Sequence, residues 1–469
     1  MNRIKSAKPI CSSTINHQLS IINSIQEEEL TMTTTNNPLS MPERGRIAKM
    51  AGIQLSATDT QTRSAALTAI ADALEKNRAA LIAANQKDYE RSASENLAAP
   101  LLGRLTFDDH KIDDVIDGIH SLTLLEDPLG ATRMATELDT GLELYKITCP
   151  IGVVGIIFES RPDAFVQIST LCLKSGNAVL LKGGREALET NRLLCKVISE
   201  ATASVGIPDG WIQNLESRDD VNAMLALDDY IDLIIPRGSN SFVKYIMDHS
   251  NIPVMGHSDG ICHAYVDASA DLDKAVNIAV DAKTQYVSAC NTIETLLVHK
   301  DIASDFLPKL KAGMDQKQVH LKGNDRVRAV IDVEAATEDD WSTEYLDYIL
   351  SIKVVDSLEE AIDHINTYGS GHTDVIVTED EAHAKKFTTL VDSAGVYVNC
   401  SSRFADGFRY GFGAEVGIST SKLHARGPVG LDGLLSYKYK LIGHGDIVGD
   451  FSDGKRSFTH KSLDQDCPL

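Results

Sequence analysis

One cysteine stands where a nucleophile for covalent catalysis would be displayed. Cys290 lies in the stretch 285–292, and the chain directly after it is apolar and β-branched over 293–298. A thiol at the mouth of such a segment can be presented to an acyl carbon, which a thiolate attacks well near neutral pH. The chain has 8 cysteines, and none forms a CxxC or a Cys/His pattern with zinc-ligand spacing. The sequence therefore predicts a catalytic thiol and no bound metal.

Two glycine-bearing segments are candidates for holding a nucleotide. Lys182-Gly-Gly-Arg185 follows a predicted strand at 178–182, and Gly238-Ser239 follows another at 231–235. Glycine lets the main chain approach a ligand, basic side chains pair with phosphate, and a helix opening at Ser239 would offer free N–H groups. An exposed turn or a simple helix cap explains each motif equally well on its own. Because both follow strands of one sheet, where such sheets bind ligands, their agreement favours a nucleotide site. No GxGxxG follows the first strand.

The order of predicted elements indicates an α/β protein with two doubly wound parallel sheets. Residues 41–97 have helical spacing of apolar residues, and 131–150 is typical of a β-hairpin that turns at Thr140-Gly141. Apolar runs typical of buried parallel strands then alternate with helical segments. The strands are expected at 153–158, 178–182, 231–235, 293–298, 352–355, 374–377 and 395–399, and the helices at 162–176, 185–205, 239–248, 271–283, 301–312, 357–366 and 380–390.

These elements predict a division of the chain. The hairpin at 131–150 and a strand within 434–450 would leave exposed edges in a monomer, so we expect them to mediate homo-oligomerisation. The predicted parts are a disordered N-terminal extension (1–40), a nucleotide-binding domain (41–130 and 151–260), a catalytic domain (261–430), the oligomerisation strands (131–150 and 434–450) and a C-terminal tail (451–469).

Composition narrows the classes of function. The formal net charge of −22 argues against nonspecific nucleic-acid binding, and no apolar run approaches the roughly 18 residues that span a membrane. Scattered cysteines favour a reducing compartment, so a cytoplasmic protein is expected. Residues 1–26 lack Asp and Glu and fit a mitochondrial transit peptide, although a disordered extension or an upstream start codon before Met32 or Met41 remain alternatives.

Longer motifs extend these signals. They are Ile157-Phe-Glu-Ser-Arg-Pro-Asp163, Leu181-Lys-Gly-Gly184, Ala289-Cys-Asn-Thr-Ile-Glu-Thr295, Gly413-Ala-Glu-Val-Gly-Ile-Ser-Thr420 and His424-Ala-Arg-Gly-Pro428. In this order they resemble the γ-glutamyl phosphate reductase (glutamate-5-semialdehyde dehydrogenase) family of the aldehyde dehydrogenase superfamily, over roughly residues 42–448. The resemblance implies an aldehyde-dehydrogenase-like fold and NADPH-dependent reduction of L-glutamyl 5-phosphate to L-glutamate 5-semialdehyde and phosphate, the second step of proline biosynthesis from glutamate.

The resemblance also implies roles for single residues. Cys290 would form a thioester with the acyl group, and its own backbone amide is a candidate oxyanion donor. Arg185 beside Lys182 gives a physical reason for preferring NADP(H), because a 2′-phosphate favours a basic fork, although Arg185 could equally face solvent. The implied NADP(H)-binding residues are Lys182, Gly184, Arg185, Gly238, Ser239 and Glu415.

A general base that hydrolytic aldehyde dehydrogenases carry is missing. Their Glu-Leu-Gly-Gly-type segment resembles 254–262 here, which contains no Glu. Without that base, water is poorly activated against a thioester, so a phosphorylating, reductive enzyme is favoured. His257 or Asp259 could still act as a base. The Asn oxyanion donor of hydrolytic relatives is also absent, and Ser160 or Arg161 stands near its position.

Polar residues of the glycine-rich loops could bind the charged substrate. Its carboxylate and phosphate call for cations and its amine for a carboxylate, although a surface salt bridge is an equally good interpretation of any one of them, Lys422 included. The candidates for substrate binding are Ser160, Arg161, Arg403, Asp406, His424 and Arg426.

Alternative functions remain open at this point. A hydrolytic or coenzyme A-acylating enzyme would keep the fold and the thiol, and a binding scaffold would keep the fold alone. Intact Cys290, Lys182 and Glu415 argue against the scaffold. The resemblance further predicts possible association with a glutamate 5-kinase, which makes the labile acyl phosphate.

Overall fold

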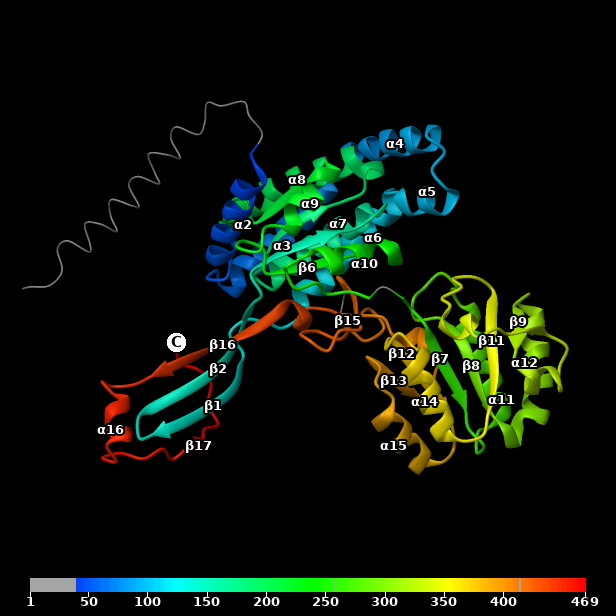
Figure 1. Ribbon diagram of the computed structural model, residues 1–469. Coiled ribbons are helices and arrows are strands. Elements are labelled where there is room, and N and C mark those ends of the chain that lie inside the picture. The colour runs from blue at the N-terminus through cyan, green and yellow to red at the C-terminus, as the bar shows by residue number, and fades with distance from the viewer. Residues whose placement is uncertain (1–38, 258, 413–414) are drawn as a thin grey trace, which may run out of the picture.

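The computed structural model describes residues 39–257, 259–412 and 415–469. They form two parallel sheets with helices packed against them and an antiparallel arm that projects from the first sheet (Figure 1). The predicted α/β fold class is confirmed. The transit-type segment 1–26 and most of the predicted extension lie outside the described residues. Among the described residues, no helix is both long and apolar enough to cross a bilayer.

The first sheet is parallel throughout, with strand order β5-β4-β3-β6. Every residue of β3, β4 and β6 is buried, which explains why these strands appear as unbroken apolar runs in the sequence. Because β4 and β6 lie on opposite sides of β3, the order reverses there, and such a reversal opens a crevice beyond the carboxyl ends. The strands are β3 (Val153–Ile157), β4 (Ala178–Lys182), β5 (Ile212–Leu215) and β6 (Leu233–Pro236).

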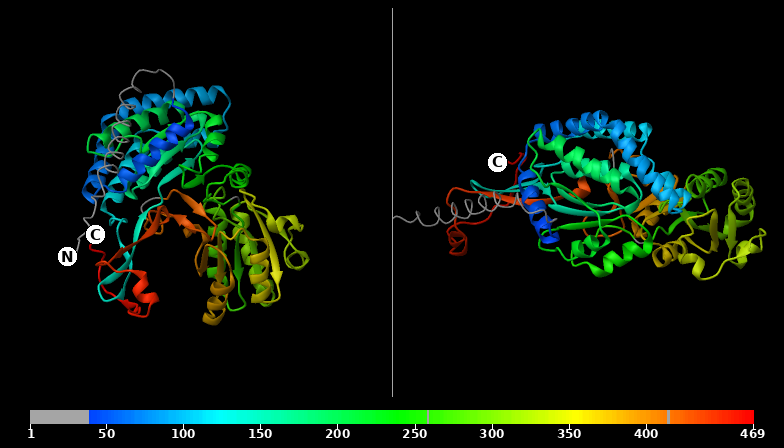
Figure 2. Two further views of the ribbon diagram at one scale, coloured as in Figure 1. Left: turned by 60° about the vertical axis from the view of Figure 1, so that its left-hand side comes forward. Right: turned by 90° about the horizontal axis from the view of Figure 1, so that it is seen from above.

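Helices lie on both faces of the first sheet (Figure 2). The predicted helical region 41–97 is confirmed as three helices, and Asp59 separates the first two by accepting the N–H of Thr62 as an N-cap. Pro162 occupies the first position of α7, where its missing N–H costs nothing. The helices are α2 (Met41–Leu55), α3 (Thr60–Lys76), α4 (Arg78–Ser94), α5 (Ala99–Leu105), α6 (Asp109–Leu124), α7 (Pro162–Lys174), α8 (Leu188–Ala203), α9 (Arg218–Leu225) and α10 (Asn240–His249).

The second sheet is also parallel and has the order β10-β9-β11-β8-β7-β12-β13. Two separate apolar clusters pack on it, one shared with α11 and α12 and the other with α14 and α15. The strands are β7 (Cys262–Val266), β8 (Ile293–His299), β9 (His320–Gly323), β10 (Glu334–Ala335), β11 (Ile349–Val355), β12 (Thr373–Val377) and β13 (Gly395–Val398), and the helices are α11 (Leu272–Thr284), α12 (Ala303–Gln316), α13 (Asp325–Arg328), α14 (Leu358–Tyr368) and α15 (Glu381–Leu390).

The arm is an antiparallel sheet with the order β16-β2-β1-β17. The predicted hairpin is confirmed, with Gly141 at a φ of +75° in its turn. The predicted C-terminal tail contributes a strand, and Arg456 ties that tail to Asp139 and Asp446. The arm elements are β1 (Thr132–Asp139), β2 (Leu142–Pro150), β16 (Leu435–Ile442), α16 (Val448–Ser452) and β17 (Lys461–Ser462), while β14 (Gly417–Ser419) and β15 (Gly427–Val429) form a separate small hairpin.

Sequence patterns missed several strands, and β7 shows why. Its first two residues, Cys262 and His263, are fully buried although both are polar, and the main-chain N–H of His263 donates to Asp374 in the neighbouring β12 over 2.7 Å. Because the strand begins with buried polar residues, it is not an unbroken apolar run in the sequence. β5 is only four residues long and half its residues are partly exposed, so it too lacked a signal.

Candidate active site

The two parallel sheets meet with opposite polarity. The first contributes the segments that follow β3, β4 and β6, at its carboxyl ends. The second contributes Cys290, just before β8, and His372, directly before β12, at its amino ends. The chain crosses between the sheets through residues 255–257 and 259–261, immediately after an isolated bridge of Val254 to Ile234 in β6. The candidate site lies at this junction.

Cys290 sits in the turn between α11 and β8 with its thiol beside an imidazole. Its Sγ lies 3.2 Å from His372 Nε2. Burial raises the pKa of the Cys290 thiol to about 12, nearby Glu344 and Glu415 raise it further, and Arg237 opposes them. The thiol is therefore protonated in this state of the site. A substrate or a cation must change these surroundings before the sulfur can attack.

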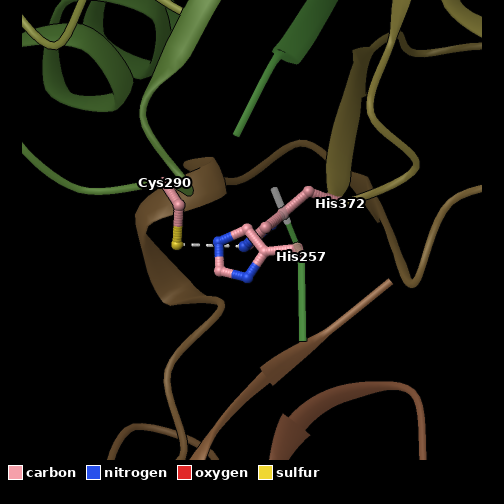
Figure 3. Close-up of side chains that lie close together, drawn as sticks. All are labelled: His257, Cys290 and His372. Carbon is pink, nitrogen blue, oxygen red and sulfur yellow. Dashed lines mark hydrogen bonds between the residues drawn. The ribbon is translucent and has the colours of Figure 1, made fainter. Parts of the chain in front are cut away.

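Two histidines from different segments face this thiol (Figure 3). The rings of His257 and His372 are 5.1 Å apart in an edge-to-face arrangement. His257 Nδ1 lies 3.2 Å from the carbonyl oxygen of Ile418, and His372 Nδ1 lies 2.9 Å from Thr373 Oγ1. Burial lowers the pKa of both imidazoles, and each ring is further affected by nearby cationic or imidazole groups. Of the two base candidates expected in 254–262, His257 faces the sulfur.

The main chain around Cys290 is tightly held. The thiol of Cys262 donates to the Cys290 carbonyl oxygen over 3.2 Å. A Cβ added to Gly260 would lie 2.4 Å from that oxygen and 2.5 Å from Cys290 Cα, so only glycine fits. The Nδ2 of Asn291 donates to the carbonyl of Ala405, which ties the nucleophile turn to the loop after β13.

The carboxylate of Glu344 lies beside Gly260, next to the main chain of Cys290. The Cβ added to Gly260 would also meet Glu344 Oε1, at 2.6 Å, and Asn240 Nδ2 donates to Glu344 Oε2 over 2.6 Å. The same amide nitrogen lies 3.1 Å from Asp259 Oδ1. Asp259 and Glu344 therefore share a partner at the start of α10.

The predicted Lys182 motif forms a tight turn at the carboxyl end of β4. Lys182 is buried, and its Nζ donates to the carbonyl of Gly183 over 2.6 Å. A Cβ on Gly184 would lie 1.8 Å from Glu186 Oε1, so a larger residue here would displace the Glu186 side chain. Arg185 points outward, with 80% of its side chain exposed and its nearest carboxylate, Glu95, 3.7 Å away. A buried lysine and an exposed arginine thus flank one glycine turn.

The predicted Gly238-Ser239 motif precedes α10. Both residues are exposed, and the Ser239 side chain makes no capping hydrogen bond to the helix. The first N–H groups of a ten-residue helix are thus available to a ligand. Glu415 accepts the N–H of Gly407 over 2.9 Å, and burial raises its pKa while Arg237 lowers it.

Ser160 and Arg161 follow β3. Ser160 has a φ of +40°, unusual for a residue with a side chain, and both its N–H and its hydroxyl donate to Glu186 Oε1 over 2.6 Å. Ser160 is thus engaged by a carboxylate that the sequence patterns did not single out. Arg161 lies 3.7 Å from Asp163 and is electrostatically close to Glu415.

The predicted substrate residues fall into two groups. Arg403 is buried, donates from Nε to Gln285 Oε1 over 2.9 Å, and lies near enough to Cys290 for each to affect the other's charge. Asp406 accepts the N–H of Arg409 on the same loop. Arg403 is thus close to the thiol, and Asp406 is close to Glu415.

The second group lies on the loop between β14 and β15. Arg426 contacts Asp392 at 3.2 Å, and Lys422 forms an ion pair with the same carboxylate. His424 Nε2 lies 3.2 Å from the carbonyl of Gly433. Among the described residues, the side-chain partners of these three are Asp392 and Gly433 and do not include Cys290. Arg403 is therefore close to the thiol, whereas Arg426 pairs with Asp392.

Comparison with known proteins gives this arrangement a family. Residues 11–339 and 330–424 match the model of the aldehyde dehydrogenase family. A gamma-glutamyl phosphate reductase of Acetivibrio thermocellus is 63% identical over 431 residues, which cover 92% of this chain and all of that protein. A protein of the same name from Natronomonas pharaonis is 52% identical over 425 residues, covering 89% of this chain and 96% of the relative.

Solved structures agree. The crystal structure of gamma-glutamyl phosphate reductase from Thermotoga maritima superposes with a TM-score of 0.85 at 40% identity, covering 87% of this chain and 99% of that one. An acetylating aldehyde dehydrogenase from Geobacillus thermoglucosidasius, at 18% identity and a TM-score of 0.60 with coverage of 87% and 97%, shares the fold. The resemblance inferred from the motifs is confirmed, and the chain belongs to the aldehyde dehydrogenase family.

Proposed function

We propose that this chain reduces L-glutamyl 5-phosphate to L-glutamate 5-semialdehyde and phosphate with NADPH, in proline biosynthesis from glutamate. The observation that carries the proposal is the placement of Cys290 between the sheets, with His372 Nε2 3.2 Å from its sulfur and the imidazole of His257 beside it. The substrate comes from the relatives, which bear the name gamma-glutamyl phosphate reductase at up to 63% identity among those compared.

The chemistry at Cys290 is an acyl transfer. The sulfur attacks the acyl carbon, and an S–C bond forms. The bond between the acyl carbon and the bridging oxygen of the phosphate breaks, and phosphate leaves. The thiol proton passes to His372 Nε2, the acceptor recorded nearest to it at 3.2 Å. NADPH, when bound, supplies the hydride that turns the acyl group held on Cys290 into the aldehyde.

The described residues fit this cofactor. Lys182 and Arg185 present a buried and an exposed cation on one glycine turn, which suits a ribose that carries a 2′-phosphate. The uncapped start of α10 at Ser239 suits a pyrophosphate, and the carboxylate of Glu415 suits ribose hydroxyls. The Lys182–Arg185 turn follows β4 and the start of α10 follows β6, so both lie at the carboxyl ends of the first sheet. Glu415 is close to Arg237, which directly follows β6.

The lack of a Glu in segment 254–262 supports phosphate as the acyl acceptor in the reverse direction. Segment 254–262 has no Glu, and the nearby carboxylates Asp259 and Glu344 are both bound to Asn240. This shared hydrogen-bond donor holds Asp259 and Glu344 at the start of α10, which disfavours either as the base that would activate water against a thioester.

The arm supports a homo-oligomer. Tyr437, Tyr439 and Leu441 on the edge strand β16 each expose more than half of their side chains. An unpaired edge strand offers a template for pairing with another chain, and we infer that a second copy covers this one.

The testing experiment is oxidation of L-glutamate 5-semialdehyde by the purified chain, with NADP⁺ or NAD⁺ and with or without inorganic phosphate. We expect activity that requires phosphate and is faster with NADP⁺. Phosphate-independent oxidation would assign a hydrolytic reaction instead, and a requirement for coenzyme A would assign an acylating one.

A further inference from the structure

The thiol of Cys290 and the imidazoles of His257 and His372 form a cluster with the composition of a metal site. Their ligand atoms, one from each residue, all lie within 4.8 Å of one another. In a tetrahedral zinc site, Zn–S distances of about 2.3 Å and Zn–N distances of about 2.0–2.1 Å place ligand atoms roughly 3.3–3.6 Å apart. The Cys290 Sγ to His372 Nε2 distance of 3.2 Å is already close to this value. The other pairs need to approach by no more than about 1.5 Å, the difference from their 4.8 Å limit.

The outer hydrogen bonds orient both rings for coordination. A carbonyl oxygen can only accept, so His257 Nδ1 donates to Ile418 and leaves Nε2 with a free lone pair. His372 Nδ1 lies 2.9 Å from Thr373 Oγ1, a hydroxyl that accepts from it when Nδ1 carries the proton, and His372 Nε2 faces Cys290 Sγ. A metal-ligating histidine normally donates its remote ring nitrogen to a carbonyl or a similar acceptor in this way.

The three ligands also come from segments that packing holds in place. His257 lies on the chain that crosses between the sheets, Cys290 precedes β8, and His372 directly precedes β12. The contacts of Gly260 and Cys262 with the main chain of Cys290 restrain the nucleophile. A site of two imidazoles and one thiolate matches zinc in softness and leaves a fourth position open for water.

We propose that His257, Cys290 and His372 bind one Zn²⁺ per chain and that the bound ion reversibly blocks the nucleophile. The ion displaces the thiol proton to solvent and forms a bond to Sγ, which then cannot attack an acyl carbon. Metal binding stands on the geometry alone, whereas the block of activity rests on the function proposed above.

The test uses the purified full-length chain in a buffer free of chelators and added thiols. Co²⁺ is titrated in as a coloured substitute for Zn²⁺, and the sulfur-to-cobalt absorption band in the near ultraviolet is recorded. We expect one Co²⁺ per chain and a band that stoichiometric Zn²⁺ abolishes. Absence of binding, or a stoichiometry unaffected by loss of the thiol, overturns the proposal.

Variants assign the ligands. Cys290→Ser should remove the band. Because loss of an outer hydrogen bond already costs about 10–100-fold in metal affinity, His257→Ala and His372→Ala should weaken binding by on the order of 100-fold or more. Cys149→Ser in the arm and His120→Ala on the surface of α6 are matched controls and should bind as the unchanged chain does. Equal binding by the two His variants and the controls would refute the cluster.

A second measurement needs no variant. Zn²⁺ should protect Cys290 of the unchanged chain from iodoacetamide by at least about 10-fold in rate, and EDTA should restore labelling, as read by peptide mass spectrometry. Labelling of Cys290 at an unaltered rate overturns the proposal. If Zn²⁺ binds and protects Cys290 while the semialdehyde assay shows no activity at all, the metal site stands and the proposed function fails.

Discussion

The two ends of the second sheet use buried polar groups in opposite ways. At the carboxyl ends of β7 and β12, Asp267 is buried and accepts hydrogen bonds from Tyr265, Ser269, Thr378 and His383. At the opposite end of the sheet, before β8 and β12, the Cys290 thiol lies within hydrogen-bonding distance of His372. The carboxylate of Asp267 thus accepts four side-chain hydrogen bonds, whereas among the described residues the thiol of Cys290 has few hydrogen bonds and can react with a substrate.

This contrast separates stability from chemistry within one sheet. Burial raises the pKa of Asp267, but hydrogen bonds from His383, Thr378 and Ser269 outweigh it and hold that pKa at about 2. For Cys290, burial dominates and raises the pKa to about 12. The hydrogen-bonded carboxylate of Asp267 stabilises the fold. The buried thiol of Cys290 stays protonated until a substrate binds.

Replacing the nucleophile should give the largest effect and should fall on activity alone. Cys290→Ala is expected to lower kcat/KM by about 10⁴-fold or more, because no other group can form the covalent acyl intermediate. Its free energy of unfolding should change by less than about 1 kcal/mol, since few contacts are lost. Steady-state kinetics and urea unfolding measure the two, with Cys149→Ser as control. Activity within 10-fold of the unchanged chain would end the assignment of Cys290.

Removing the carboxylate of Asp267 should show the reverse pattern. Asp267→Ala leaves several buried donors without their acceptor, so we expect the free energy of unfolding to fall by about 3 kcal/mol. The kcat should stay within about 2-fold, because Asp267 lies at the opposite ends of the strands from Cys290. Asp301→Ala, at an exposed carboxylate of the same sheet end, is the control. A loss below about 1 kcal/mol would show that the network is not stabilising.

The smallest effect should depend on pH. The hydrogen bond with Asp267 raises the pKa of His383, so the stabilisation from this pair is fully present below the unfolded value of about 6.5 and is lost as pH rises through the folded value. Because His383 is 42% exposed, we expect His383→Gln to lose less than about 1 kcal/mol at about pH 5.5 and almost nothing at about pH 8.5. Urea unfolding at both pH values checks this. A loss that grows with pH would have the wrong sign.

Local patterns predicted the parts of this molecule whose cause is local. Buried parallel strands, the hairpin turn at Gly141 and the display of Cys290 before β8 all depend on neighbouring residues. The partners of Cys290 do not. His372 reaches the sulfur from 82 residues away, because β12 and β8 flank β7 in the sheet.

The same reason explains other omissions. Glu186 binds Ser160 through the pairing of β3 with β4, and β17 joins the arm from the far end of the chain. The search for zinc ligands by spacing found none, since His257, Cys290 and His372 come from three segments that only the folded sheet brings together. Strand order supplies these contacts, and no short motif encodes it.

Gly260 joins the crossing between the sheets directly to the nucleophile. It lies on that crossing, and its Cα hydrogen faces the main chain of Cys290, where a methyl group would not fit. The position of the Cys290 main chain is therefore set by backbone contact with the crossing, without an intervening side chain, so a displacement of Gly260 would act on the nucleophile directly.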